Sequence, residues 1–253
     1  MSALLLDVGN TRLKWGVLDD GGIRRTGHIS QEKLREQGLS ALTTKLPRRV
    51  DAVWVSNVVG TSFATRLSGV LGLHCNADVH FARSERRGWG VTNGYRQPRR
   101  LGVDRWVAMV GAWSEIQSAC LVVDAGTALT LDAIDDDGVH LGGQIIPGAE
   151  TMFESLATAT SDIPHVAASS KQSSGDLKMF GANTAAAVRE GAQNAVAGAI
   201  ERAIRTLRSN AYDPTIILTG GGASRILGAL EETPMHSPNL VLSGLAHMLE
   251  TDQ

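Results

Sequence analysis

Cysteine is scarce in this sequence, and neither sign of charge is in excess. Only two of the 253 residues are cysteines, Cys75 and Cys120, and neither lies in a Cys-x-x-Cys pair or beside a cluster of histidines. This spacing argues against a disulfide framework and against a zinc site, and it fits a reducing compartment. The formal net charge is −2. Without an overall basic field, neither nucleic acid nor a membrane is expected as the main partner.

Long apolar runs are missing as well. The apolar segment at the N-terminus, Ala3 to Leu6, is too short for a signal peptide, and no stretch approaches the roughly 20 apolar residues of a membrane span. We therefore expect a cytoplasmic protein. Hydrophobic residues make up 43% of the chain and charged residues 20%, which is enough to bury the core of one large or two small domains.

A stretch at the N-terminus occurs twice. Residues 4–22, LLLDVGNTRLKWGVLDDGG, align without gaps with residues 121–139, LVVDAGTALTLDAIDDDGV, at an offset of 117. Each copy reads as a β-rich run, an Asp-x-Gly turn, a second run and an Asp-Asp-Gly turn of the kind that closes hairpins. The two copies predict two related domains, which we place at residues 1–117 and 118–253.

Strand-like and helix-like segments alternate in the rest of the chain. The sequence predicts a strand over residues 51–58 and a helix over residues 61–71 that is opened by a Thr or Ser cap. A long alanine-rich helix is predicted from about Met179 to Leu207, and its small residues suit either the core or an oligomer contact. Residues 215–227 read as a strand, a glycine turn and a helix.

The Asp-x-Gly turns are suited to hold a phosphate. Glycine lets backbone N–H groups approach an anion, and Asn10 and Thr11 add donors. Asp7 would repel bare phosphates, so its place in the turn suggests a magnesium ion between them. Lys14 on the outgoing strand is able to reach the same anion. A plain hairpin with a solvated lysine is the alternative for one copy alone, but the second copy and the glycines at 220–222 favour a bound nucleotide.

Three glycine turns after apolar strands, in a chain with a duplicated unit, resemble the acetate and sugar kinase, Hsp70 and actin superfamily. The resemblance implies an α/β, ribonuclease H-like fold of two duplicated domains, with the nucleotide in the cleft between them. It leaves the phosphoryl acceptor open.

A second group of motifs narrows the acceptor. Tyr95-x-x-Pro98 is followed by Gly102-x-Asp104-Arg105. The remaining motifs are Asp-x-Gly-Asn-Thr-x-x-Lys at residue 7, Asp-Ala-Gly-Thr-Ala at 124, Gly-Gly-x-Ile-x-Pro-Gly at 142 and Asn-Thr at 183. In this order they resemble the motifs of type III pantothenate kinases. The resemblance implies ATP-dependent phosphorylation of pantothenate to 4'-phosphopantothenate, the first step of coenzyme A biosynthesis.

The same resemblance implies a role for each matching residue. Asp104 is the general base that accepts the proton of the pantothenate hydroxyl. Asp124 matches the position that holds a monovalent cation, K⁺ or NH₄⁺, and Asp7 lies near Mg²⁺, directly or through water. The family is typically homodimeric. The implied ATP-binding residues are Asp7, Val8, Gly9, Asn10, Thr11, Arg12, Leu13, Lys14 and Thr127, and the implied pantothenate-binding residues are Tyr95, Gly102, Val103, Asp104, Arg105 and Thr184.

Several interpretations stay open at this point. Asp104 could serve only to favour the start of a helix, through the helix dipole. Arg105 could steady either the pantothenate carboxylate or the moving phosphoryl group. Seven arginines lie between Arg83 and Arg105, but no helix-turn-helix pattern accompanies them, so a solvated or substrate-facing cluster is favoured over nucleic acid.

Two other functions compete with the pantothenate kinase. One keeps the kinase fold and changes the acceptor to a sugar or a small acid, which the stretch from Tyr95 to Arg105 disfavours. The other is a transcriptional accessory regulator on a kinase fold. An acid at position 104 favours the enzyme, because a protein that only binds its ligand has no need of a base there.

Overall fold

The computed structural model describes residues 2–161, 163 and 179–251. By contacts the chain divides into two compact units. The first comprises Met1–Gln117, Gly138–His140 and Asn239–Gln253, and the second comprises Ser118–Asp137 and Leu141–Pro238. The two domains placed from the sequence at 1–117 and 118–253 stay a prediction. By contacts, the C-terminal segment lies with the first unit.

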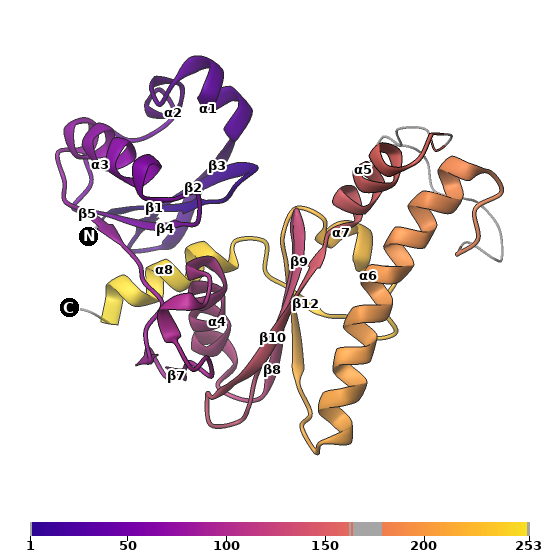
Figure 1. The fold of residues 1–253 in the computed structure, drawn as a ribbon. Helices are drawn as coiled ribbons and strands as arrows, with labels where there is room; N and C mark the ends of the chain where they lie inside the picture. Colours follow the sequence, from indigo (N-terminus) through magenta and orange to yellow (C-terminus); the bar gives the residue numbers. More distant parts are fainter. Residues whose placement is uncertain (1, 162, 164–178, 252–253) are drawn as a thin grey trace. The chain divides into compact units, whose positions relative to one another are not determined.

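The first unit is built on a five-stranded sheet with a mixed strand order (Figure 1). A central strand has an antiparallel hairpin on one side and two parallel strands on the other, in the order β3-β2-β1-β4-β5. The strands are β1 (Ala3–Val8), β2 (Arg12–Asp19), β3 (Gly22–Ser30), β4 (Ala52–Asn57) and β5 (Val79–Phe81).

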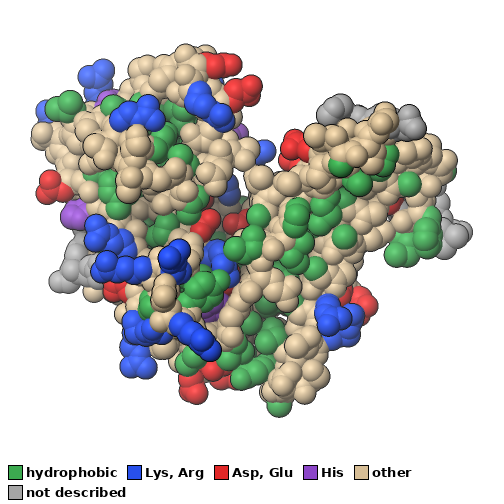
Figure 2. All heavy atoms as spheres, viewed as in Figure 1, with side chains coloured by type: hydrophobic (Ala, Val, Ile, Leu, Met, Phe, Trp, Pro, Cys, Tyr) green, Lys and Arg blue, Asp and Glu red, His purple; other side chains and the backbone are tan. Residues whose placement is uncertain are grey.

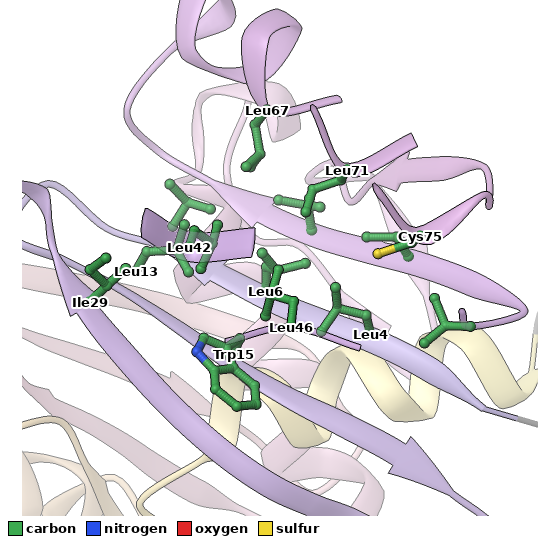
Figure 3. Close-up of a cluster of buried hydrophobic side chains, with 14 of the residues drawn as sticks. Leu4, Leu6, Leu13, Trp15, Ile29, Leu42, Leu46, Leu67, Leu71 and Cys75 are labelled. Carbon is green, nitrogen blue, oxygen red and sulfur yellow. The ribbon is translucent and has the colours of Figure 1, made fainter. Parts of the chain in front are cut away.

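Alternation along these strands places apolar side chains on both faces of the sheet. One face carries Leu4, Leu6 and Val8 of β1, which pack with side chains from α1 (Gln31–Gln37), α2 (Ser40–Thr43) and α3 (Thr61–Cys75) in a buried cluster (Figure 3). Two further helices, α4 (Val103–Ile116) and α8 (Leu240–Thr251), pack on the opposite face.

Two glycines allow the second layer to approach closely. A Cβ atom on Gly16 of β2 would lie 3.2 Å from a methyl carbon of Leu242 in α8. A Cβ atom on Gly111 of α4 would lie 2.7 Å from the carbonyl oxygen of Leu240. Glycine at these positions lets α8 lie against the sheet and against α4 without a clash. Between β5 and α4 run the short strands β6 (Arg87–Gly88) and β7 (Val91–Thr92) and a 3₁₀ turn, η1 (Pro98–Arg100).

The second unit repeats the same strand order, β10-β9-β8-β11-β12. Its helices α5, α6 and α7 supply a buried cluster with β8, β9 and β11. The α/β fold of two duplicated domains, predicted from the repeat, is therefore confirmed. The elements are β8 (Cys120–Ala125), β9 (Ala128–Ile134), β10 (His140–Pro147), β11 (Thr215–Thr219), β12 (Met235–His236), α5 (Ala149–Ala159), α6 (Thr184–Ser209) and α7 (Ala223–Ile226).

The gapless offset of 117 residues holds only for the first strand of each copy. Asp7 pairs with Lys14 across the β1–β2 hairpin, whereas Asp124 pairs with Thr130 across β8–β9, one residue earlier than the offset requires. The cause is the turn, because three residues separate β1 from β2 and only two separate β8 from β9. Lys14 therefore has Thr130 as its counterpart, and the second hairpin has no lysine at that place.

Two details of the predicted helices were wrong. Helix α3 begins at Thr61 as expected, but its N-cap is Gly60, and no side chain caps it. The long helix begins at Thr184 and not at Met179, because the side chain of Asn183 accepts a 2.9 Å hydrogen bond from the backbone N–H of Ala186 and stops the helix there. The predicted apolar face of this helix is core, with buried Val188, Ala192, Val196, Ile200 and Ile204.

None of the helices in the described part of the chain combines the length and the apolar character that crossing a membrane requires.

Candidate active site

The first Asp-x-Gly turn is a tight loop, and hydrogen bonds fix both of its arms at the base. The N–H of Gly9 donates to the carbonyl oxygen of Arg12 at 2.9 Å and closes the turn. Gln31, the first residue of α1, donates its backbone N–H to the carbonyl oxygen of Thr11 at 2.9 Å and its side-chain amide to that of Gly9 at 2.8 Å. Asn10, Thr11 and Arg12 remain exposed. The loop is thus fixed at its base and open at its tip, as a phosphate-binding turn must be.

Side chains on either side of this turn point in two directions. Val8 and Leu13 are fully buried in the hydrophobic cluster of the first unit, so only their backbone groups are available to a ligand. Asp7 and Lys14 are directly opposite each other on the other face of the hairpin, and both are partly exposed. A carboxylate and an ammonium group at this point suit a metal-bound phosphate, which needs both a metal ligand and a neutralising cation.

The start of α4 carries the Gly-x-Asp-Arg motif. Gly102 is the N-cap, Val103 is partly exposed as the first residue of the helix, and Asp104 lies in its first turn with one carboxylate oxygen accepting a 2.8 Å hydrogen bond from the N–H of Arg105. A Cβ atom on residue 102 would lie 2.7 Å from that same carboxylate oxygen. The absence of a side chain at position 102 therefore leaves the room that the Asp104 carboxylate occupies. The acid both supports the helix start, as one alternative held, and stays partly exposed to a ligand.

Arg105 is buried and is held against Tyr95. One guanidinium nitrogen donates to the Tyr95 hydroxyl at 3.1 Å, and the guanidinium carbon lies 5.8 Å from the centroid of the tyrosine ring. The imidazole of His140 stacks on the same ring, at 5.8 Å between centroids and 18° between planes. This arrangement fixes a cation and a phenol next to Asp104, and it is suited to bind a small anionic, hydroxyl-bearing substrate.

The loop around Tyr95 is fixed by two polar side chains. Asn93, which is 1% exposed, accepts from the N–H of Tyr95 at 3.0 Å and donates to the carbonyl oxygen of Pro98 at 3.2 Å. Arg86 donates to the carbonyl oxygens of residues 93, 95 and 96 at 2.9–3.2 Å. One of the clustered arginines therefore has a structural task, namely to hold the loop that presents the tyrosine.

Two more arginines of the cluster, Arg83 and Arg99, border a basic groove together with Arg86. The groove has a volume of about 660 Å³ and is lined by Arg83, Ser84, Glu85, Arg86, Gln97, Pro98 and Arg99. Lys and Arg side chains gather on the part of the first unit that carries β7 (Figure 2). A basic surface beside the Tyr95 loop attracts anionic ligands.

In the second unit the structure brings two of the glycine turns together. The N–H of Gly222 donates to the carbonyl oxygen of Ala125 at 2.8 Å, and a side chain on Gly220, whose φ is +94°, would collide with the Asp124 carboxylate. The carbonyl oxygen of Thr127 accepts from the N–H of Gly148 at 2.9 Å and from the hydroxyl of Thr151 at 2.7 Å. Asp124 is partly exposed, and Thr127 is exposed.

Thr184 is exposed as the first residue of α6. Within the first unit the sequence missed Gln31, Asn93 and His140, which support the predicted site residues. No local pattern marks Gln31, because its two bonds reach a loop about twenty residues earlier in the chain. His140 had one signal, its position two residues after the Asp-Asp-Gly turn of the second copy.

A divalent metal would depend on few protein ligands here. No group of three or more His, Cys, Asp or Glu side chains able to hold a metal ion occurs within residues 2–161, 163 and 179–251. Mg²⁺ fits such a site, since it commonly keeps several waters and takes one or two carboxylates together with substrate phosphates. A single carboxylate at Asp7, beside the Asp-x-Gly turn, is in keeping with that habit.

Comparisons with known proteins agree on one family. A family model for type III pantothenate kinase matches residues 3–206. A relative named type III pantothenate kinase from Azoarcus sp. (strain BH72) is 39% identical over 251 residues, which cover 98% of this chain and 91% of the relative. One of the same name from Dechloromonas aromatica (strain RCB) is 38% identical over 243 residues, covering 96% and 97%.

A solved structure supports the fold. The activator of the 2-hydroxyisocaproyl-CoA dehydratase from Clostridium difficile, with bound ADPNP, superposes with a TM-score of 0.53 at 14% identity. The match covers 98% of this chain and 92% of the other. At that identity the two are alike in fold alone.

Proposed function

The chain belongs to the type III pantothenate kinase family, and from that premise we propose that it transfers the γ-phosphoryl group of ATP to the hydroxyl group of pantothenate. The product is 4'-phosphopantothenate, and the reaction is the first step of coenzyme A biosynthesis. The observation that carries the proposal is the start of α4, where Asp104 is followed by an arginine held on Tyr95. Such a kinase uses ATP together with a divalent metal ion.

Asp104 acts as the general base. Phosphoryl transfer depends mostly on positioning and on charge neutralisation, so the base has only to lie within hydrogen-bond reach of the substrate hydroxyl. The carboxylate is partly exposed, and Gly102 leaves it room. Tyr95, Gly102, Val103, Arg105 and Thr184 bind pantothenate. Support for Arg105 comes from its burial against Tyr95, which fixes its charge at one place.

The turn from Asp7 to Lys14 binds the ATP phosphates, and Thr127 contributes from the second copy of the motif. The hydrogen bonds at the base of the first turn support this role, because a fixed turn presents its N–H groups without further ordering. Asp7 holds the divalent metal that neutralises the transferred charge. Val8 and Leu13 take part through their backbone only.

Three finer assignments accompany the kinase. Asp124 holds a monovalent cation, K⁺ or NH₄⁺, and its support is the close approach of Gly220, where any side chain would collide with that carboxylate. The enzyme is a homodimer, and the support is a pair of exposed apolar side chains, Met179 and Phe180, just before α6. It works in the cytoplasm, where ATP and the precursors of coenzyme A are present.

The central experiment compares acceptors. Purified protein with ATP and Mg²⁺ is given pantothenate, a panel of sugars or acetate, and ADP release is followed together with the mass of the product. We expect ADP release and a phosphorylated product with pantothenate alone. Turnover of a sugar or of acetate, but not of pantothenate, would overturn the assignment of the acceptor.

The finer assignments have separate tests. Replacing K⁺ by Na⁺ should lower activity strongly, and equal rates in K⁺, NH₄⁺ and Na⁺ would remove the cation from Asp124. Light scattering should give the mass of a dimer, and a fully active monomer would contradict it. The alternative, a transcriptional accessory regulator, is not favoured, because the two relatives described above are named as kinases.

A further inference from the structure

We propose that Ser56, near the end of β4, is a positioning residue for the metal–nucleotide complex. Its hydroxyl orients a water molecule of the metal's hydration shell beside Asp7. The inference rests on the proposed function, since it assumes that a divalent metal bound to a nucleotide lies at Asp7.

The first observation is an unsatisfied hydroxyl in the sheet. Ser56 is 0% exposed, and its Oγ atom has no hydrogen-bond partner among the residues that the structure describes. A buried hydroxyl group is nearly always hydrogen-bonded, because leaving it unpaired costs free energy. A partner outside the chain, such as a held water or a ligand, resolves this cost.

The second observation is the register of the sheet. Ser56 pairs with Asp7 across the parallel β4–β1 ladder, Asp7 pairs with Lys14, and Lys14 pairs with His28 of β3. Residues that pair in this way point their side chains to the same face. Ser56 therefore stands in one row with the proposed metal ligand and with the proposed phosphate-binding lysine.

The third observation is the identity of that face. The apolar cluster under α1, α2 and α3 takes Leu6 and Val8 from β1 and Val53 and Val55 from β4, so Ser56 points to the opposite face. That face is the one on which α4 and α8 pack, and α4 itself lies against β4. The hydroxyl is thus on the side of the sheet that carries Asp104.

A water molecule is the partner that fits between Ser56 and Asp7. Neighbouring strands lie about 4.8 Å apart, a span that one water bridges with two hydrogen bonds. Mg²⁺ keeps most of its water ligands, and groups that hold those waters orient the metal as protein ligands do. The unsatisfied Ser56 hydroxyl, in register with Asp7 across the β4–β1 ladder, is a group that fits such a hydrated metal.

The test compares metal–nucleotide affinity in variants of the full-length protein. Ser56→Ala removes the hydroxyl, and Ser56→Cys keeps a side chain of the same shape and slightly larger size but replaces the oxygen by a weakly hydrogen-bonding sulfur. The affinity for Mn²⁺·ADP is measured from the electron paramagnetic resonance signal of free Mn²⁺, and the affinity for metal-free ADP by calorimetry. We expect both variants to bind Mn²⁺·ADP about 10-fold more weakly, in line with other residues that orient metal ligands, and to bind metal-free ADP as before.

A matched control variant distinguishes a role of Ser56 in metal binding from a purely structural role. Ser84 is a second buried serine of the same unit, but its hydroxyl donates to the carbonyl oxygen of Leu101 at 2.9 Å. Ser84→Ala should lower the melting temperature and leave Mn²⁺·ADP affinity unchanged. Ser56→Ala should show the opposite pattern, because it removes an unpaired group.

Two outcomes would overturn the inference. The first is Mn²⁺·ADP affinity within twofold of wild type in both Ser56 variants. The second is an equal loss of affinity with and without metal, together with a lower melting temperature, which would assign Ser56 a structural role. Wild-type protein that binds Mn²⁺·ADP but does not phosphorylate pantothenate would overturn the proposed acceptor alone, and the comparison at Ser56 would still decide this inference.

Discussion

The side-chain amide of Gln31 donates a 2.8 Å hydrogen bond to the carbonyl oxygen of Gly9. The backbone N–H of Gln31 donates to the carbonyl oxygen of Thr11 on the other side of the same turn. One buried residue at the start of α1 therefore holds both arms of the Asp-x-Gly loop. Asn10, Thr11 and Arg12 at its tip are exposed, and the loop does not have to be ordered by the nucleotide.

Gln31→Met should weaken nucleotide binding more than it weakens the fold. Methionine keeps the length and the apolar stem but cannot donate to Gly9, so the turn loses one of its two supports. We expect the KM for ATP to rise about 10-fold with little change for pantothenate, and stability to fall by about 1–2 kcal/mol. Steady-state kinetics and urea unfolding measure both.

Gln37→Met is the matched control for this change. Gln37 lies at the other end of α1 and is exposed, so its substitution should leave both KM values and the stability unaltered. If Gln31→Met raised the two KM values equally, the loop-holding role would be wrong.

Tyr95→Phe tests whether the hydroxyl of Tyr95 places Arg105 for the acceptor. Phenylalanine keeps the ring that stacks on His140 but loses the oxygen that accepts from the Arg105 guanidinium. A hydrogen bond to a charged group contributes about 1.5–3 kcal/mol, and the partial exposure of Tyr95 reduces that figure. We expect the KM for pantothenate to rise about 5- to 10-fold with the KM for ATP unchanged.

The only other tyrosine supplies the control for that experiment. Tyr212 follows α6 in the second unit, and Tyr212→Phe should change neither constant. A Tyr95→Phe enzyme with wild-type kinetics would show that the ring alone positions Arg105.

Local signals explain which parts of the site the sequence could predict. The first hairpin and the start of α4 are each set by a few adjacent residues, so Asp7 to Lys14 and Gly102 to Arg105 could be placed on a turn and at a helix start. The contact between Tyr95 and His140 joins residues 45 positions apart, and periodicity carries no information about such pairs.

Longer-range packing explains what could not be predicted. The spacing of apolar residues in α8 shows that the helix has an apolar face, but it does not show which sheet that face covers. Contact with α4 and with the first sheet is decided by Gly16, Gly111 and Gly244, which leave room for the helix. The gapless repeat failed for a similar reason, since a turn shorter by one residue keeps the same pattern in sequence while it shifts the pairing.

Cys120 should make the protein less stable at alkaline pH. Burial raises the pKa of its thiol from an ordinary 9.0 to about 12. Below pH 9 the thiol is protonated in both the folded and the unfolded chain. The part of the free energy of unfolding that depends on this thiol is therefore fully present there. Above pH 9 the unfolded chain loses the proton while the folded chain retains it, and stability falls by at most about 1.4 kcal/mol per pH unit towards pH 12.

Cys120→Ala should flatten this dependence. Urea unfolding at pH 8, 9.5 and 10.5 gives the slope of stability against pH for both proteins. The cavity left by the thiol lowers the stability of the variant by the same amount at each pH, so the difference between the slopes reports the titration alone. Equal slopes for the two proteins would show that the Cys120 thiol does not change its protonation on unfolding in this pH range.

Asp104→Asn separates base catalysis from support of the helix start. Asparagine has nearly the same size, and its oxygen can still accept the 2.8 Å hydrogen bond from the N–H of Arg105, so the melting temperature should hardly change. The amide cannot take the proton of the pantothenate hydroxyl, and removal of a general base typically lowers kcat by about 10²–10⁴-fold, or roughly 3–5 kcal/mol of barrier. Binding of ATP should survive.

Gly102→Ala is the companion variant, because its new methyl group would lie 2.7 Å from the carboxylate oxygen of Asp104 and displace an intact acid. We expect kcat to fall in both variants. An Asp104→Asn enzyme within a few fold of the wild-type kcat, with unchanged melting, would return Asp104 to the role of helix support.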